Sequence, residues 1–166
     1  MIFAVDVAYR ENKAVAASVL FQNWEDGEPA AELTVEISTV AEYEPGQFYK
    51  RELPCILELL KRLQQLPECI VIDGYVYLDG THKPGLGKHL YDALEGKTAV
   101  IGVAKSRFKD TPPETEIFRG SSTHALYVTA VGIGETEAKD CIMRMQGEYR
   151  LPTILKRVDQ LSKGFS

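Results

Sequence analysis

The sequence contains no apolar run long enough to cross a membrane. A membrane-spanning helix needs about 20 consecutive apolar residues, and charged residues, glycines or prolines interrupt every hydrophobic stretch well before that length. The first residues, Met1 to Asp6, also lack the basic segment with which a signal peptide begins. We therefore expect a cytoplasmic protein with no membrane partner.

Cysteine is scarce, and the cysteines are not paired. The three that are present, Cys55, Cys69 and Cys141, lie in apolar surroundings, and none follows another at the spacing of a metal-binding or redox motif. They are expected to be small buried side chains in a reducing compartment. This pattern argues against a disulfide scaffold and against a thiolate metal centre.

Positively charged residues are fewer than negatively charged ones. Lysine and arginine number 19 against 24 aspartates and glutamates, which gives a net charge of −5. A protein that coats nucleic acid without regard to sequence relies on many phosphate contacts, so this balance argues against that class. It leaves open an enzyme with a local basic patch around an acidic, metal-bearing centre.

The length and the apolar content are those of one globular domain. The chain has 166 residues, of which 45% are hydrophobic, and a chain of this size buries about 70% of its extended surface on folding. No internal repeat, low-complexity tract or linker divides it. We expect residues 1–166 to form a single domain.

Hydrophobic periodicity predicts alternating strands and helices. Short apolar or alternating stretches indicate strands, and apolar residues spaced by three and four indicate helices. The expected strands span residues 2–9, 14–21, 31–40, 69–72, 98–104 and 124–130, and the expected helices span 51–64, 86–94, 135–147 and 153–163. This order matches the ribonuclease H-like fold. We therefore expect an α/β protein with a mixed sheet, three antiparallel strands followed by parallel strands, flanked by helices.

Three acids lie at the ends of predicted core elements. Asp6 interrupts the apolar strand I-F-A-V-D-V-A, Glu52 stands at the start of the first helix, and Asp73 ends the strand C-I-V-I-D. Such positions are fixed by the backbone, and carboxylates are the ligands that Mg²⁺ and Mn²⁺ prefer. We expect the three side chains to converge on a divalent metal. The alternatives are a helix-start acid for Glu52 and turn chemistry for Asp73.

Further charged residues suit phosphodiester hydrolysis. That reaction requires charge neutralisation on the phosphoryl oxygens and an activated water. Lys105 directly follows the strand 98–104, a place from which its ammonium would stabilise developing negative charge. Asp159, on the last helix, is either a further ligand or a supporting acid. Lys50 and Arg51, at the start of the first helix, are candidates for phosphate contacts.

Six short motifs follow one another along the chain. They are V-D-V-A-Y at 5–9, Y-E-P-G-Q-F-Y-K-R-E-L-P at 43–54, V-I-D-G at 71–74, H-K-P-G-L-G-K-H-L at 82–90, I-G-V-A-K-S at 101–106 and Y-R-L-P-T-I-L-K-R-V-D at 149–159. In this order they resemble the endonuclease V family, metal-dependent nucleases that recognise deaminated purines. The resemblance covers nearly the whole chain, from Asp6 to Leu161.

The resemblance implies a reaction and a set of catalytic residues. The reaction is hydrolysis, with Mg²⁺ or Mn²⁺, of a phosphodiester on the 3′ side of deoxyinosine or inosine in DNA or RNA. The implied metal ligands are Asp6, Glu52 and Asp73. Lys105 matches the family's lysine near the scissile phosphate, and Asp159 matches its late acid.

The resemblance also implies a substrate-binding surface. Tyr43 falls on the position of the aromatic wedge that enters the duplex beside the lesion and helps to turn the base out. Gly46, Gly74 and Gly85 fall where the backbone approaches the flipped base. Base extrusion costs on the order of a few kcal/mol and least at a poorly paired base such as inosine. The candidate substrate-binding residues are Tyr43, Gly46, Lys50, Arg51, Gly74, His82, Gly85 and His89.

The expected binding surface departs from the family's pattern. The loop after Asp73 reads Y-V-Y-L-D-G-T-H-K-P instead of a short glycine-rich and basic stretch, and Glu42, Glu44 and Asp79 add negative charge. Two alternatives follow from this difference. One is a relative that binds inosine-containing nucleic acid without cleaving it, and the other is a metal nuclease on the same scaffold that acts on RNA or branched DNA.

Overall fold

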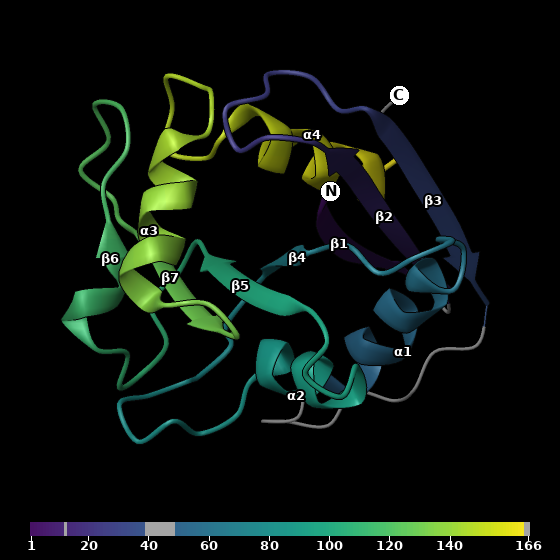
Figure 1. Ribbon diagram of the computed structural model, residues 1–166, viewed down its shortest axis with the longest axis horizontal. Coiled ribbons are helices and arrows are strands. Elements are labelled where there is room, and N and C mark those ends of the chain that lie inside the picture. The colour runs from purple at the N-terminus through teal and green to yellow at the C-terminus, as the bar shows by residue number, and fades with distance from the viewer. Residues whose placement is uncertain (12, 39–48, 165–166) are drawn as a thin grey trace.

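A seven-stranded mixed sheet with helices on both faces forms the body of the protein (Figure 1). The computed structural model describes residues 1–11, 13–38 and 49–164. The strands are β1 (Ile2–Arg10), β2 (Lys13–Phe21), β3 (Ala31–Ile37), β4 (Cys69–Asp73), β5 (Ala99–Ala104), β6 (Glu116–Ile117) and β7 (Leu126–Val131). The α-helices in the described residues are α1 (Tyr49–Leu60), α2 (Leu86–Ala93), α3 (Glu135–Arg144) and α4 (Thr153–Ser162), and a 3₁₀ turn spans Pro113–Thr115.

The order of the strands confirms the predicted fold class. It is β3-β2-β1-β4-β5-β7-β6. β1, β2 and β3 form an antiparallel meander, and β4 and β5 run parallel to β1. Because β1, β4 and β5 are apolar along almost their whole length, they occupy the middle of the sheet, where both faces of a strand are covered. This is the ribonuclease H-like arrangement.

Strand β7 runs opposite to the predicted parallel direction, and β6 was not predicted as a strand. β7 is antiparallel to β5, and the two-residue β6 is antiparallel to β7 at the far edge of the sheet. A parallel neighbour requires a crossover connection, usually through an α-helix. The segment between β5 and β7 contains only the 3₁₀ turn and β6. The chain therefore returns along the sheet in the opposite direction.

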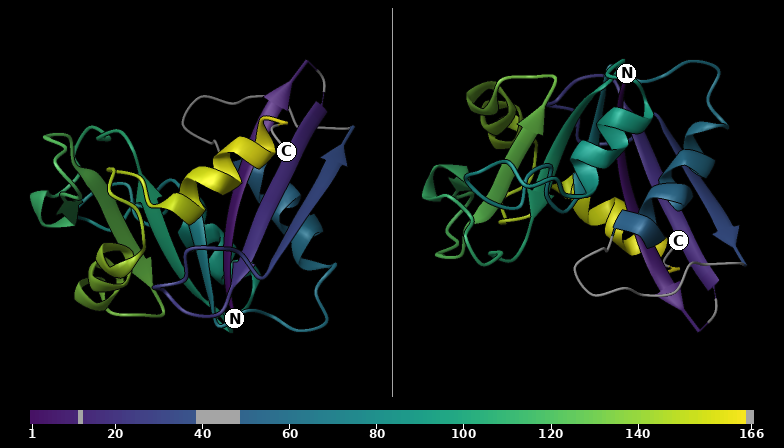
Figure 2. Two further views of the ribbon diagram at one scale, coloured as in Figure 1. Left: turned by 90° about the horizontal axis from the view of Figure 1, so that it is seen from above. Right: turned by 90° about the horizontal axis from the view of Figure 1, so that it is seen from below.

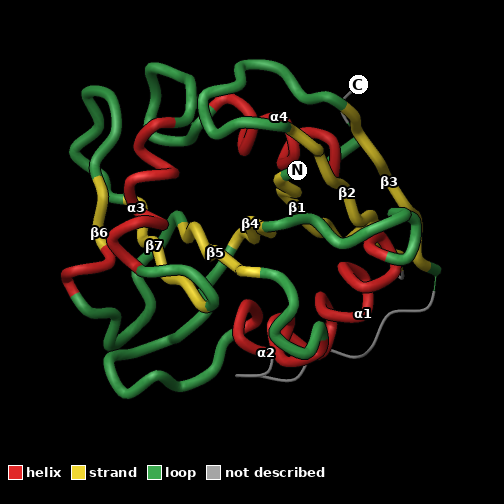
Figure 3. Tube along the Cα trace, viewed as in Figure 1, coloured by secondary structure: helices red, strands yellow, loops and turns green. Residues whose placement is uncertain are grey.

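In the described part of the chain, two α-helices cover each face of the sheet (Figures 2 and 3). α3 and α4 lie on one face and α1 and α2 on the other. Side chains alternate between the faces along each strand, so Ala4 and Val71 pack below α4 while Phe3 and Ile70 pack against α1. The sheet therefore separates two apolar layers.

Helix α1 begins two residues earlier and ends four residues earlier than its apolar pattern predicted. Beyond Leu60 the hydrogen bonds shift to three-residue spacing, as in the bond from the Leu63 N–H to the Leu60 carbonyl (3.1 Å), so the chain tightens and the α-helix ends. At its other end, Glu52 lies in the first helical turn. An acid is favoured there by the peptide dipoles.

The structure agrees with what was expected of the cysteines. Cys55, Cys69 and Cys141 are all buried and unbridged, as predicted. Within the described residues, no helix is long and apolar enough to cross a bilayer.

Candidate active site

Three of the predicted catalytic side chains meet because of strand register. β1, β4 and β5 are parallel, so their carboxyl ends lie at the same edge of the sheet. Val5 pairs with Ile72 and Asp73 pairs with Val103, which places Asp6 beside Asp73 and Lys105 just beyond them.

Alternation along the strands decides the face on which these side chains lie. Ala4, Val71 and Val103 all belong to the apolar layer below α4, and Asp6, Asp73 and Lys105 each follow one of them by two residues. The three side chains therefore lie on the α4 side of the sheet.

Helix α4 closes this edge into a small pocket with a cavity volume of about 20 Å³. Its polar lining is Asp6, Asp73, Lys105 and Asp159. Its walls are apolar side chains from β1, β4, β5, α4 and the segment just before α4: Val5, Val71, Ile72, Val103, Leu151, Leu155 and Val158. The Lys105 ammonium lies 3.5 Å from an Asp73 carboxylate oxygen and 3.6 Å from one of Asp159. One cation thus bridges an acid from the sheet and an acid from the helix.

The Asp6 carboxyl is partly buried and strongly perturbed. The Val7 N–H donates to its Oδ1 (2.9 Å), and the Ser162 hydroxyl lies 3.5 Å from its Oδ2. Burial, followed by repulsion from Asp73 and a hydrogen bond with the Asp159 carboxyl, raises the pKa of Asp6 to about 8, and Lys105 only partly opposes this.

The same cluster of charges lowers the pKa of Asp159 and raises the pKa of Lys105. Burial tends to raise the pKa of Asp159, but hydrogen bonds from Lys163 (3.0 Å) and Asp6 and the charge of Lys105 hold it below its usual value. Burial alone would lower the pKa of Lys105, yet the surrounding acids raise it, Asp73 most strongly. Asp159 therefore stays an anion and Lys105 a cation.

Glu52 approaches the cluster from the other face of the sheet. It does not line the pocket, but its partly buried carboxyl has a pKa raised to about 7, first by burial and then by the charge of Asp73, against an opposing effect of Arg51. Asp73 thus interacts electrostatically with both of the other predicted ligands.

The chemistry of these acids fits a hard divalent cation. Within the described residues, no three Asp, Glu, His or Cys side chains stand ready-made as a metal-binding group. The donors are nevertheless all carboxylates, the type that Mg²⁺ and Mn²⁺ prefer. Burial first, and then the charge of Asp73, raises the pKa of Asp6 and of Glu52, and a bound cation would stabilise the ionised form of both carboxyls.

The two predicted histidines each stack on a tyrosine near this edge. His82, with a φ of 62°, stacks on Tyr77 with ring centroids 4.5 Å apart, and His89 of α2 stacks on Tyr49 of α1 at 3.6 Å. Burial lowers the pKa of His89. Both rings are therefore held in place by aromatic contacts.

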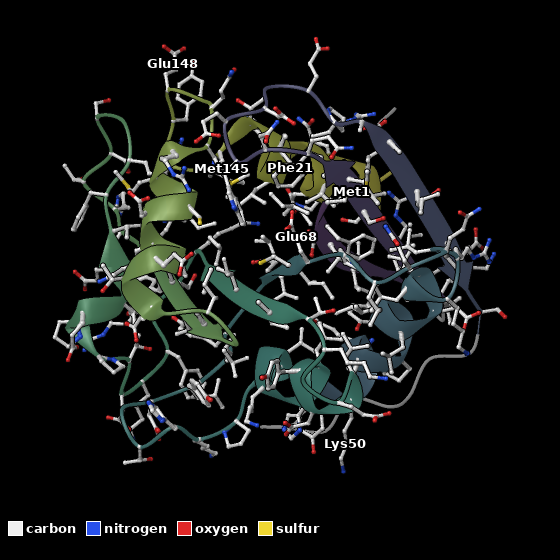
Figure 4. The ribbon with its side chains drawn as sticks, in the orientation of Figure 1. Met1, Phe21, Lys50, Glu68, Met145 and Glu148 are labelled. Carbon is white, nitrogen blue, oxygen red and sulfur yellow. The ribbon has the colours of Figure 1, made fainter. Side chains whose placement is uncertain are left out.

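The remaining predicted substrate residues are distributed between the described and the undescribed parts of the chain. Lys50 is exposed and extends from the rim of the molecule (Figure 4), and the Arg51 guanidinium lies 4.0 Å above the Tyr9 ring. Tyr43 and Gly46 lie outside the described residues.

Two predicted glycines have backbone geometry that suits their positions. Gly74 has a φ of 144°, which side-chain-bearing residues rarely adopt, and at Gly85 a Cβ atom would lie 2.6 Å from the Tyr75 carbonyl oxygen. A side chain at Gly85 would force α2 away from the strand end.

Three contributors to this edge were missed by sequence reasoning. They are Tyr75, Arg150 and Ser162, whose contacts involve mainly backbone carbonyls or a distant side chain. Ser162 carried the clearest signal, since it lies three residues after Asp159 and therefore on the same side of α4.

Comparison with protein families gives a match to the family described as Endonuclease V over residues 1–136. The Endonuclease V of Pyrococcus horikoshii is 32% identical over 167 residues, which cover 98% of this chain and 73% of that protein. The Endonuclease V of Nostoc punctiforme is 30% identical, over 75% of this chain and 64% of that protein.

Solved structures show the same fold. The Endonuclease V of Streptomyces avermitilis aligns with a TM-score of 0.76 at 26% identity, over 98% of this chain and 79% of that one. The Endonuclease V of Ciona intestinalis, solved in complex with a 23mer DNA containing an inosine, aligns with a TM-score of 0.79 at 17% identity, over 98% of this chain and 83% of that one.

Proposed function

The chain belongs to the endonuclease V family, and from this premise we propose that it is a Mg²⁺- or Mn²⁺-dependent endonuclease. It hydrolyses a phosphodiester on the 3′ side of deoxyinosine or inosine. Residues 1–166 act as one domain in the cytoplasm. The inosine-containing DNA bound by the Ciona relative supports the substrate class.

The single observation that carries the proposal is the meeting of charged side chains at one edge of the sheet. Asp6 and Asp73 lie on adjacent parallel strands, and Lys105 reaches both Asp73 and Asp159 within 3.6 Å. A structural ion pair needs one acid for each cation. Here Asp6, Asp73 and Asp159 outnumber Lys105 and Lys163, as expected where a metal and a phosphate bind together.

The residues that would hold the metal are Asp6, Glu52 and Asp73. The bound cation would supply charge neutralisation on the phosphoryl oxygens and would acidify an attacking water. Asp73, between the other two acids, orients them through its charge. Asp159 holds Lys105 from the helix side, and its hydrogen bond with Asp6 keeps both carboxyls in place.

Lys105 is the group suited to the phosphate. Its surrounding acids keep it protonated, and its ammonium lies at the open edge of the sheet, one residue beyond β5. There it would stabilise the charge that develops on the phosphoryl oxygens. His82, His89, Lys50 and Arg51 would contact the strand on the α1 and α2 side.

The test is a nicking assay on labelled DNA and RNA strands that contain a single inosine, with Mn²⁺, with Mg²⁺ and with EDTA. Wild-type protein is expected to cut 3′ of the inosine only when a metal is present. Asp73→Ala should remove cutting by at least about a hundredfold because it deletes a metal ligand. Asp140→Ala, an exposed acid of α3, is the matched control and should cut normally.

The alternatives give different results in the same assay. A non-cleaving binder would shift the inosine strand in a gel and leave it intact with either metal. A nuclease of different preference would cut undamaged RNA or branched DNA as well as it cuts the inosine strand. Wild-type-like cutting by Asp73→Ala would rule out the metal site proposed here.

A further inference from the structure

We propose that Tyr75 and Arg150 are positioning residues that fix the backbone at Lys105 and in the segment directly after it. As a result, the Lys105 ammonium stays between Asp73 and Asp159. This inference rests on the proposed function, which gives Lys105 its role. It concerns two side chains that come from different parts of the chain and meet the same short segment.

Lys105 needs external support because it lies past the end of its strand. The β5–β7 ladder ends with the pair Ala104 and Tyr127, so the Lys105 carbonyl has no ladder partner. A long, flexible side chain on an unsupported backbone loses several rotatable bonds of freedom when it is held in one place. Fixing the backbone in advance reduces that cost.

Arg150 supplies the first clamp. Its Nη1 donates to the carbonyl of Lys105 (3.1 Å) and to the carbonyl of Ala125 (3.2 Å), just before β7. One planar guanidinium therefore joins the end of β5 to the start of β7, where the hydrogen-bond ladder between these strands stops. Charge-assisted hydrogen bonds of this kind are stronger than neutral ones.

Tyr75 supplies the second clamp, on the residues that follow Lys105. Its hydroxyl donates to the Ser106 carbonyl (2.6 Å) and accepts from the Phe108 N–H (3.1 Å). The ring is 9% exposed and packs against the Phe108 ring. Because Tyr75 comes two residues after Asp73, it ties the position of that acid to the position of the lysine.

The connection that carries Arg150 is itself held rigidly. Arg119, 4% exposed, donates to four carbonyls of the α3–α4 connection, those of Met145 (2.6 Å), Gly147 (3.2 Å), Tyr149 (2.8 Å) and Arg150 (3.2 Å). Met145 and Glu148 mark this connection in Figure 4. The Arg150 side chain therefore starts from a fixed backbone.

The first experiment measures kcat and KM for the variants Tyr75→Phe and Arg150→Met. Each is expected to lower kcat about tenfold, since small misplacement of a catalytic group is costly, with KM changed by less than about twofold. The matched controls are Tyr127→Phe, at a tyrosine of β7 whose hydroxyl makes no hydrogen bond within the described part of the chain, and Arg62→Met, at an exposed arginine beyond α1.

A double-mutant cycle tests whether the two residues lower kcat by misplacing Lys105 or by an effect that does not involve Lys105. In a Lys105→Met background, Tyr75→Phe and Arg150→Met should lower kcat by less than about twofold, because the group that they position is gone. If the losses multiply instead, the two residues act independently of Lys105 and the inference is wrong. Tyr75→Phe keeps the buried ring, so it tests the idea even if Arg150→Met folds poorly.

A measurement of the Lys105 environment that does not depend on cleavage tests this inference separately from the proposed function. The lysines are reductively methylated with ¹³C, which preserves their charge, and their methyl groups are observed by NMR. The methyl resonance of Lys105 is assigned by its absence from the spectrum of Lys105→Met. In Tyr75→Phe and Arg150→Met the Lys105 signal is expected to move toward the signals of exposed lysines. An unmoved signal overturns the positioning role. Absence of cleavage by wild-type protein would instead count against the proposed function alone.

Discussion

At the scale of single residues, Asp73 is the acid that links the others. It raises the pKa of both Asp6 and Glu52, and Lys105 lies 3.5 Å from it. Its own side chain is 40% exposed, which leaves it accessible from solvent. The three predicted ligands are therefore unequal. Two are partly buried and reluctant to ionise, and the accessible one is in a position to meet an incoming cation first.

Arg119 offers a sharp test of stability at the same scale. Arg119→Met would leave four carbonyls of the α3–α4 connection without their donor. Orphaned buried acceptors are expensive, so we expect a loss of about 2–4 kcal/mol in the free energy of unfolding. Urea unfolding followed by circular dichroism measures it. Arg62→Met, an exposed arginine beyond α1, is the control, and an equal loss there would contradict the explanation.

The same residues show which parts of the site the sequence could reveal. Asp6 and Asp73 were predictable because an acid inside or at the end of an apolar strand is conspicuous. Tyr75 and Arg150 were not, because their partners are carbonyls of residues 31 and 45 positions away. Carbonyls are present at every position, so no pattern of residue types marks such a contact in advance.

At the scale of elements, the helices on both faces are needed to hold the strands that carry the acids. Ile154 of α4 and Ile56 of α1 are 2% and 1% exposed, and they pack into opposite layers. Each anchors its helix to the sheet.

Truncating either anchor should therefore cost similar stability. We expect Ile154→Ala and Ile56→Ala each to lower the free energy of unfolding by about 2–5 kcal/mol through lost burial and a residual cavity. Denaturant titrations provide the values, with the exposed Leu66→Ala as a reference. A loss below 1 kcal/mol, roughly the surface range, at one position would mean that its helix is not an essential cover.

Element boundaries and strand direction mark the limit of prediction at this scale. Within residues 1–11, 13–38 and 49–164, apolar periodicity located the four α-helices and the six longer strands, because burial alone sets that signal. The direction of β7 depends on how the segment after Lys105 crosses the sheet, and that segment carries no helical period from which the crossover could be inferred. The start of α1 was misplaced although Tyr49, four residues before Leu53, continues its apolar stripe.

At the scale of the whole molecule, metal binding should stabilise the fold. A cation that binds only the folded chain adds about 2.7 kcal/mol at a hundred times its dissociation constant, which corresponds to a rise in Tm of roughly 5–10 °C for a chain of this size. Calorimetry with Mn²⁺ and with EDTA tests this. The rise should disappear in Asp73→Asn and persist in Asp140→Asn. An equal rise in all three proteins would indicate binding elsewhere.

The position of β4, fourth of seven strands, also bears on how this architecture can vary. The proposed active site lies at the middle of the sheet, and the edge strands β3 and β6 are each two strands away from β1 and β5, which flank β4. Lengthening or trimming a rim would leave the central geometry unchanged. The fold thus allows its chemistry to be inherited while its peripheral surfaces are remodelled, and grafting loops onto the rims is a practical route to new target preferences.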